Sequence, residues 1–362
     1  MMTNPKALIG MSGGVDSSVA ALLMLREGFS CIGATMRLYN NEDIGMEDTK
    51  TCCSLEDVED ARSVARRLGI PHYVFNFRDD FEENVICRFV KAYEQGLTPN
   101  PCIDCNRYLK FDHLLRRALE LECDCVVTGH YARIRKDPET GRYLMLTAAD
   151  ADKDQTYFLY TMTQHQLSRT RFPLGELTKT QVREIARENG FVNARKRDSQ
   201  DICFVPEGDY AAFLERYTGK HYPEGPFLDT QGNRVGTHRG AVAYTIGQRR
   251  GLGLAMGEPV YVCGKDMEAN TVTVGPSEML FHSSLIAGNC NWIPFPALTH
   301  PIAVTAKTRH TRTGSPATVS PLADGRIRVD FEAPQRAITP GQAVVLYQDN
   351  LVLGGGTIEF SM

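Results

Sequence analysis

Up to about residue 205, short apolar runs alternate with amphipathic windows. Four runs have the length and composition of buried strands, namely residues 7–11, 31–36, 72–77 and 125–128. Four windows carry apolar residues at helical spacing, namely residues 19–28, 58–68, 81–93 and 109–121. Strands that alternate with helices are typical of a parallel sheet covered by helices, so the pattern predicts a doubly wound α/β fold.

After about residue 205 the pattern changes to short alternating runs that Gly and Pro separate. Residues 259–262 and 271–274 flank a turn, and residues 317–319 are expected to pair with residues 326–330. These features predict a small linking β-domain and a C-terminal β-barrel. The predicted domain limits are 1–205, 206–276 and 277–362.

Composition agrees with a globular chain, because 42% of the 362 residues are hydrophobic and 23% are charged. The net charge of −4 shows no overall basicity, so any nucleic-acid contact must come from local clusters. The apolar stretch 7–9 is too short for a signal sequence, and no window approaches a membrane span. Eleven cysteines are too few for a disulfide framework. We expect a monomeric cytoplasmic protein without a membrane partner.

A glycine-rich loop joins the first predicted strand to the first predicted helix, and it reads Gly10-Met11-Ser12-Gly13-Gly14-Val15-Asp16-Ser17-Ser18. Glycines allow successive N–H groups to turn toward an anion, and the helix N-terminus favours phosphate. The serines add hydroxyl donors. The loop lacks the ending of a Walker A motif and the spacing of a dinucleotide fingerprint, so it predicts a phosphate site of another kind.

Two segments carry cysteines that are candidates for catalysis or metal binding. Cys102 and Cys105 follow the proline-stiffened stretch 98–101 just before a predicted helix, where a thiol is expected to have a lowered pKa. Cys203 follows the basic run 195–197, whose cations are expected to stabilise a thiolate or persulfide. Cys52 and Cys53 precede a predicted helix and are interpreted as structural.

The glycine-rich loop resembles the PP-loop, Ser-Gly-Gly-x-Asp-Ser, of enzymes that split ATP between its α and β phosphates. Over nearly its whole length the chain resembles the bacterial tRNA-specific 2-thiouridylases, in the PP-loop and in the segments 98–101, 128–132, 153–157, 201–204 and 245–249. The resemblance implies ATP and Mg²⁺ as cofactors, tRNA as substrate, and a sulfur-donor protein or sulfide as partner. It implies adenylation of the 2-oxygen of the wobble uridine and its replacement by sulfur.

The resemblance also assigns residues. Cys203 matches the cysteine that receives sulfur as a persulfide, and Cys105 matches the cysteine that attacks it. The implied nucleotide-binding residues are Gly10, Met11, Ser12, Gly13, Gly14, Val15, Asp16, Ser17, Met36 and Gly129. The implied tRNA-binding residues are Asn100, Pro101, Cys102, His130, Lys153, Asp154, Gln155, Arg309, His310 and Gln342.

One position departs from the family, because many members carry Asp where this chain has Cys102. Cys102, Cys105 and Cys203 together resemble the three-cysteine [4Fe–4S] sites of related tRNA-thiolating enzymes, in which a free iron holds hydrosulfide. The persulfide and cluster routes both stay open. An acidic role for Asp104 in place of position 102 stays open as well.

Basic groups occur at residues 195–197, 249–250 and 307–312, on three predicted domains, and could line a groove for a folded RNA. His130 could instead be a capping residue, and Gln342 could satisfy a turn. Two other functions remain open: an amidotransferase-type synthetase that acts on a small molecule with ammonia, and an RNA-binding regulator that senses a nucleotide. The synthetase chemistry does not need the paired cysteines.

Overall fold

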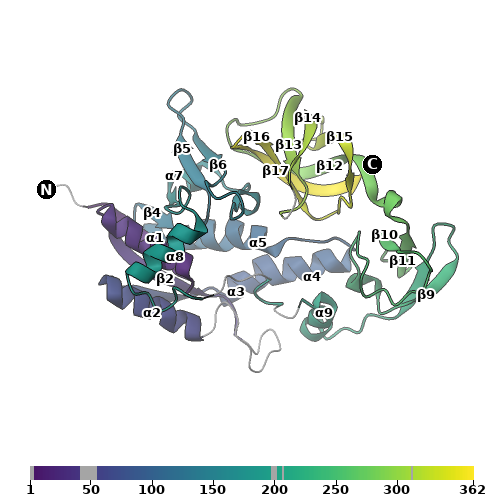
Figure 1. Ribbon diagram of the computed structural model, residues 1–362, viewed down its shortest axis with the longest axis horizontal. Coiled ribbons are helices and arrows are strands. Elements are labelled where there is room, and N and C mark those ends of the chain that lie inside the picture. Colours follow the sequence, from purple (N-terminus) through teal and green to yellow (C-terminus); the bar gives the residue numbers. More distant parts are fainter. Residues whose placement is uncertain (1–3, 41–54, 197–201, 206–207, 311–312) are drawn as a thin grey trace.

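The computed structural model describes residues 4–40, 55–196, 202–205, 208–310 and 313–362 (Figure 1). Several residues named above lie outside these ranges, namely Cys52, Cys53, Arg197, Asp201, Thr311 and Arg312. Among the described residues, no helix is long and apolar enough to cross a membrane.

The N-terminal part is built on a parallel sheet with the strand order β3-β2-β1-β4-β7. Its strands are β1 (Lys6–Gly10), β2 (Ser30–Arg37), β3 (His72–Asn76), β4 (Cys125–Val127) and β7 (Thr170–Arg171). The order reverses at β1, which β2 and β4 flank. Ligands of such sheets bind beyond the carboxyl ends of the strands at this reversal. The predicted doubly wound α/β fold is confirmed.

Helices cover both faces of this sheet. On one face, α1 (Val15–Arg26), α2 (Leu55–Leu68) and α8 (Lys179–Glu188) enclose a core that contains Ile9 and Val127 (Figure 1). On the other face, a second core contains the alternate strand residues Leu8 and Val126. Burial of alternate residues on opposite faces is what buried parallel strands require.

Two composite helical runs cover the second face. They are α3 (Arg78–Phe81), η2 (Glu82–Ile86) and α4 (Cys87–Glu94), and then α5 (Pro101–Asp104), η3 (Cys105–His113) and α6 (Leu114–Glu120). The second run begins earlier than the predicted start at residue 109. Asn100 caps it by accepting the N–H of Cys102, and proline suits the first helical position. The expectation that the cysteines precede the helix is therefore wrong, since Cys102 and Cys105 lie inside the run.

The middle part holds a four-stranded sheet of order β10-β11-β8-β9. Its elements are α9 (Tyr210–Thr218), β8 (Gly225–Leu228), β9 (Arg234–His238), η5 (Ala241–Ala243), β10 (Tyr261–Asp266) and β11 (Thr271–Gly275). β10 and β11 are antiparallel, with Val262 opposite Val274. The predicted pairing across this turn is confirmed.

The C-terminal part is a closed six-stranded barrel. After η6 (Ser277–Leu280) its strands are β12 (Phe281–Trp292), β13 (Ile302–Lys307), β14 (Ser315–Pro321), β15 (Ile327–Arg336), β16 (Ala343–Gln348) and β17 (Leu351–Ser361). β12 pairs with both β15 and β17, which closes the barrel. Val319 lies opposite Val329, so the predicted pairing of these strands is also confirmed.

A hairpin from the N-terminal part extends the sheet of the barrel, which the sequence pattern did not predict. It consists of β5 (Arg133–Lys136) and β6 (Tyr143–Leu146), and Leu146 pairs with Leu351 of β17. The helices η4 (Thr156–Phe158) and α7 (Gln164–Ser168) follow. Figure 1 shows the hairpin beside the barrel and away from the middle part. The N-terminal part and the barrel thus share one continuous sheet.

Candidate active site

The glycine-rich loop lies where the sequence predicts it, between β1 and α1. Gly13 has a φ of 74°, a conformation that L-residues with side chains rarely adopt, and its missing side chain lets the backbone of Asp57 pack against it. Gly14 precedes α1 without a side-chain cap. The first N–H groups of a helix have no partner within the helix and favour an anion. The loop thus has the form of a phosphate site.

Serine hydroxyls form hydrogen bonds within the loop. The Oγ atoms of Ser17 and Ser18 donate to the carbonyl of Gly14 at 3.1 and 3.0 Å. The Ser17 Oγ in turn accepts the N–H of Ser12 at 3.2 Å. In this arrangement the Ser17 and Ser18 hydroxyl protons point into the loop, so the phosphate donors it offers are chiefly backbone N–H groups.

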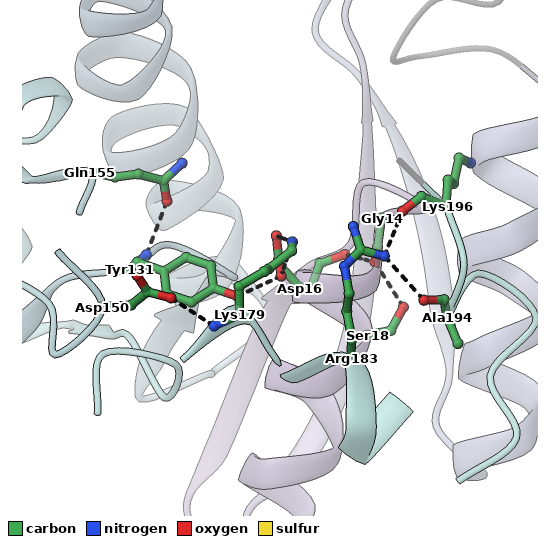
Figure 2. A network of polar contacts seen from close by, with 11 residues as sticks. Gly14, Asp16, Ser18, Tyr131, Asp150, Gln155, Lys179, Arg183, Ala194 and Lys196 are labelled. Carbon is green, nitrogen blue, oxygen red and sulfur yellow. Dashed lines mark hydrogen bonds and ion pairs between the residues drawn. The ribbon is translucent and has the colours of Figure 1, made fainter. Parts of the chain in front are cut away.

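Asp16 is the acidic residue of the loop and is bonded by two residues that the sequence analysis missed (Figure 2). Lys179 at the start of α8 places its Nζ atom 2.8 and 2.7 Å from the two carboxylate oxygens. The Tyr131 hydroxyl donates to the same carboxylate at 2.9 Å. The N–H of Lys179 donates to Asp150 at 2.8 Å, which fixes the start of α8 beside the loop. The site therefore contains a lysine that the loop sequence itself lacks.

Asn193 is a further missed residue. Its buried side chain donates to the carbonyl of Gly13 and to the Ser18 Oγ, both at 2.9 Å. No local pattern marks this asparagine, because it follows α8 and reaches the loop only through the fold. Lys196, from the predicted basic run, bonds Asp57 and Asp60 at 2.6 Å. Two carboxylates thus hold the Lys196 ammonium, and the prediction that the run 195–197 serves RNA or a persulfide stays a prediction.

The other residues predicted to bind nucleotide lie at the same end of the sheet. Met11 follows β1 and is buried, and Met36 lies near the end of β2. Gly129 follows β4, and a side chain there would come within 2.7 Å of the Ser17 nitrogen. The structure therefore gathers the ends of β1, β2 and β4 around the loop, as a nucleotide site at a strand-order reversal requires.

Cys105 is partly buried inside its helical run. Burial raises the pKa of its thiol above the usual 9.0, and Asp104 acts in the same direction, while Lys110 opposes both. The predicted lowering of the Cys105 pKa is wrong. The helix dipole acts most strongly within the first turn, and Cys105 lies beyond that turn. Asp104 is itself engaged by Arg88 at 3.3 Å, and burial raises the pKa of its carboxyl.

Cys203 lies in the short described segment 202–205, which aromatic packing fixes. The buried Phe204 ring meets Phe81 and Phe89 edge to face at 5.7 and 5.2 Å. The Tyr39 hydroxyl donates to the Cys203 carbonyl at 2.7 Å. Cys203 and Cys105 both pack against the core on the second face of the sheet, so the fold brings the two predicted catalytic cysteines to one core.

The cluster alternative finds little support in this arrangement. Cys102 is exposed, whereas Cys105 is partly buried. Within the described ranges, no three His, Cys, Asp or Glu side chains are grouped so that they could hold a metal ion. Cys102, Cys105 and Cys203 as placed here do not fit a [4Fe–4S] cluster, because all three thiolates would have to converge on it.

The predicted tRNA contacts in the segment 153–155 are mostly bonded within the protein. Asp154 is buried and accepts from the Ala148 nitrogen at 3.0 Å and from the Thr156 hydroxyl at 2.6 Å. Gln155 accepts the N–H of Tyr131 at 3.0 Å (Figure 2). Gln155 therefore holds the segment that carries Tyr131 to Asp16, whereas Asp154 joins Ala148 to Thr156. Lys153 is partly buried.

His130 is buried and lies 2.7 Å from the Thr128 hydroxyl and 3.5 Å from the Lys110 ammonium. Burial lowers the pKa of His130 well below its usual 6.5, and Lys110 lowers it further. Its imidazole is therefore neutral near pH 7. The Phe111 and Phe172 rings pack around it, as around a structural histidine.

The three predicted barrel residues behave differently from one another. His310 is exposed, and its ring lies over Phe158 at 4.4 Å. The Arg309 guanidinium donates to carbonyls of the middle part and of the barrel, and the Gln342 side chain donates to the carbonyl of Thr98 at 2.8 Å. Arg309 and Gln342 thus join parts of the protein to each other.

Together, the loop between β1 and α1, its carboxylate and its lysine at the strand ends, and the two thiols at the sheet define a PP-loop nucleotide-dependent enzyme. Three family models match successive parts of the chain: the tRNA methyl transferase HUP domain over residues 5–207, the tRNA methyl transferase PRC-barrel domain over residues 211–276, and the aminomethyltransferase beta-barrel domain over residues 282–358.

Curated relatives match the whole chain. The tRNA-specific 2-thiouridylase MnmA of Clostridioides difficile is 48% identical over 362 residues, which cover 100% of both chains. That of Heliobacterium modesticaldum is 52% identical over 97% of this chain and 91% of the relative. The chain belongs to the tRNA-specific 2-thiouridylase MnmA family of tRNA-uridine 2-sulfurtransferases.

Proposed function

We propose that this protein uses ATP to adenylate the 2-oxygen of the wobble uridine in tRNA and replaces that oxygen by sulfur. The products are 2-thiouridine in tRNA, AMP and pyrophosphate. The observation that carries the proposal is the placement of a phosphate loop at the strand ends of one parallel sheet and of two thiols, Cys105 and Cys203, against the core on one face of that sheet, in a chain that belongs to this family. The enzyme acts as a cytoplasmic monomer.

The phosphate loop binds ATP. Backbone N–H groups of residues 13–15 at the N-terminus of α1 face the phosphates, and Lys179 supplies a nearby positive charge. The segments at Met36 and Gly129 border the nucleotide. Mg²⁺ accompanies the phosphates and offsets their charge. Since Lys179 bonds both oxygens of Asp16, no protein ligand is assigned to this metal.

Adenylation makes the uracil 2-oxygen a leaving group. The oxygen attacks the α-phosphorus, and pyrophosphate leaves. Cys203 carries a persulfide received from a persulfide-bearing donor protein, and its terminal sulfur attacks C2 so that AMP departs. Cys105 then attacks the Cys203 sulfur, which releases 2-thiouridine and leaves a Cys105–Cys203 disulfide. An external dithiol reduces this disulfide and restores both thiols.

tRNA lies across the three parts of the chain. Arg249 and Arg250 are exposed in the middle part, and His310 is exposed on the barrel. The start of the cysteine helix, at Asn100, Pro101 and Cys102, borders the target base. A uridine in an anticodon loop is already single-stranded, so it can turn out into a pocket at modest cost.

A reconstitution assay tests this proposal. Purified enzyme is incubated with an unmodified tRNA transcript, ATP, Mg²⁺ and a persulfide donor, and nucleosides and AMP are quantified by mass spectrometry. We expect one 2-thiouridine per AMP released, both dependent on tRNA. AMP release without tRNA, or incorporation of nitrogen from ammonia into a small molecule, would favour the synthetase alternative.

A further inference from the structure

We propose that Gln342 of the barrel is a positioning residue for the Cys105 helix, a role that rests on the proposed function and deepens it. The barrel turn, residues 337–342 between β15 and β16, binds the backbone of Thr98 on both sides. The Gln342 Nε2 donates to the Thr98 carbonyl at 2.8 Å, and the Thr98 N–H donates to the Pro340 carbonyl at 2.9 Å. The barrel therefore binds both the backbone N–H and the backbone carbonyl of Thr98.

Thr98 lies just before the helix that carries the cysteines. Pro99 and Pro101 limit the backbone between Thr98 and Cys102, and Asn100 caps the helix by accepting the Cys102 N–H at 3.2 Å. Because this connection is short and stiff, a shift of Thr98 moves the start of the helix with it. The barrel turn therefore determines where the thiol-bearing run begins.

The contact depends on a glycine in the barrel turn. Gly341 has a φ of 89°, and a side chain there would come within 2.8 Å of the Thr98 nitrogen and 2.9 Å of the Leu97 side chain. Its N–H donates to the Ile358 carbonyl of β17 at 2.8 Å. The backbones of Gly341 and Thr98 thus approach as closely as those of two paired strands. The bond from Gly341 to β17 fixes this turn to the barrel.

Arg309 connects the barrel turn to the middle part. One guanidinium nitrogen donates to the Thr339 hydroxyl at 2.8 Å, to the Ala337 carbonyl at 3.2 Å and to the Ile246 carbonyl at 3.3 Å. Gly247 has a φ of 86°, and a side chain there would lie 2.7 Å from the Ala337 Cβ. This gives the segment 245–249 a structural role: it packs against the turn that holds Thr98.

A second contact supports the same helical run from its side. The Asn106 side chain, next to Cys105, donates to the Phe158 carbonyl at 3.2 Å. The Phe158 ring packs under the exposed His310 of the barrel at a centroid distance of 4.4 Å. The barrel thus contacts the run before its start through Gln342, and at Asn106, next to Cys105, through His310 and Phe158.

These contacts lead to a specific role for Gln342. Its side-chain amide donates to Thr98, so substitution of Gln342 changes the position of Cys105 more than the affinity for tRNA. The His310–Phe158 contact joins the exposed side of the barrel to the same helical run. The barrel therefore contributes to the chemical step as well as to substrate binding.

The test compares Gln342→Met, which keeps the size and removes the donor, with Gln348→Met, which makes the same change at the exposed end of β16, the strand that follows the barrel turn. Three quantities are measured: kcat for 2-thiouridine formation at saturating tRNA, Kd for tRNA, and the alkylation rate of Cys105 by iodoacetamide from peptide mass spectra. For Gln342→Met we expect kcat to fall about tenfold, Kd to change less than twofold, and Cys105 alkylation to change at least threefold. Gln348→Met should match the wild type in all three.

A weaker Kd with unchanged kcat and alkylation would overturn the proposal and make Gln342 a direct tRNA contact. Unchanged values throughout would overturn it too. If Gln342→Met does not fold by its melting curve, Gln342→Glu, which also lacks the donor at this position, decides the question. Absence of 2-thiouridine with the wild type would contradict the proposed function, whereas the alkylation rates test the positioning without any turnover.

Discussion

Lys179 neutralises Asp16 across the phosphate loop, with its Nζ atom within 2.8 Å of both carboxylate oxygens. The lysine side chain is 12% exposed and the aspartate 30%, so solvent screens the pair only in part. Without this lysine, the negative charge of Asp16 would oppose the phosphates of ATP. The ion pair thus makes the loop suitable for a polyanion.

We predict that Lys179→Gln lowers kcat/KM for ATP about 10- to 100-fold, the size expected from loss of a charged hydrogen bond worth about 1.5–3 kcal/mol. Tyr131 keeps its bond to Asp16, so the loop should stay folded. Initial rates of tRNA-dependent pyrophosphate release measure the effect. Arg187→Gln removes an exposed ion pair with Glu184 on the same helix and should leave the rates unchanged. Equal effects of both variants would argue for a general change in α8.

We predict that Cys203→Ser abolishes 2-thiouridine formation and AMP release while the first turnover of pyrophosphate release continues, because a hydroxyl cannot carry the terminal sulfur but the phosphate loop is intact. Cys105→Ser should stop the reaction later and leave tRNA joined to Cys203 through a disulfide. Denaturing gels with and without reductant distinguish the two. Cys87→Ser, at an exposed cysteine, is the matched control. Wild-type thiolation by Cys203→Ser would remove the persulfide step.

We predict that Cys102→Ser retains thiolation within about threefold and that anaerobically purified wild type contains no stoichiometric iron, because the described arrangement does not gather three thiolates. Iron quantification and the thiolation assay, both under anaerobic conditions, provide the measurement. Iron near four atoms per chain, lost in Cys102→Ser together with activity, would restore the cluster route.

We predict that His130 makes the protein less stable in acid. Burial lowers the pKa of His130 well below 6.5, so the unfolded chain binds a proton that the folded chain does not. The resulting loss is absent above pH 6.5 and grows as pH falls below it, by at most about 1.4 kcal/mol per pH unit. Urea unfolding between pH 5 and 7.5 should show a smaller decline for His130→Gln than for the wild type. His221→Gln, at an exposed histidine, should keep the wild-type decline.

The sequence pattern predicts those features whose cause is local. Strands such as 7–11 and 125–128 are apolar throughout because both faces of the parallel sheet are covered, and the loop 10–18 carries Gly13 where the backbone takes a positive φ. The barrel pairings of β14 with β15 follow from alternation across a turn. Such features need only neighbours along the chain, so their residues are recognisable in the sequence.

The features that were not predicted depend on distant partners. Lys179 and Asn193 are distant from the phosphate loop in sequence and contact it only in the folded structure. Nothing in their own segments distinguishes them from surface residues. Lys196 looks like part of an RNA-binding run, yet Asp57 and Asp60 of α2 pair with it. The helical run that carries Cys102 and Cys105 begins at Pro101, directly after its cap at Asn100. The predicted window began only at residue 109, where apolar residues recur at helical spacing, so this early start was not predicted.

The hairpin β5–β6 has a consequence for dissecting this enzyme into pieces. Because β6 borders β17, a truncation before β12 would strip the hairpin of its neighbour and leave an open strand edge on the nucleotide-binding fragment. The barrel expressed alone would likewise lack the hairpin and the Tyr157 hydroxyl, which donates to the Ala343 carbonyl at 2.9 Å. A fragment cut at this boundary therefore exposes backbone groups that are paired in the whole chain.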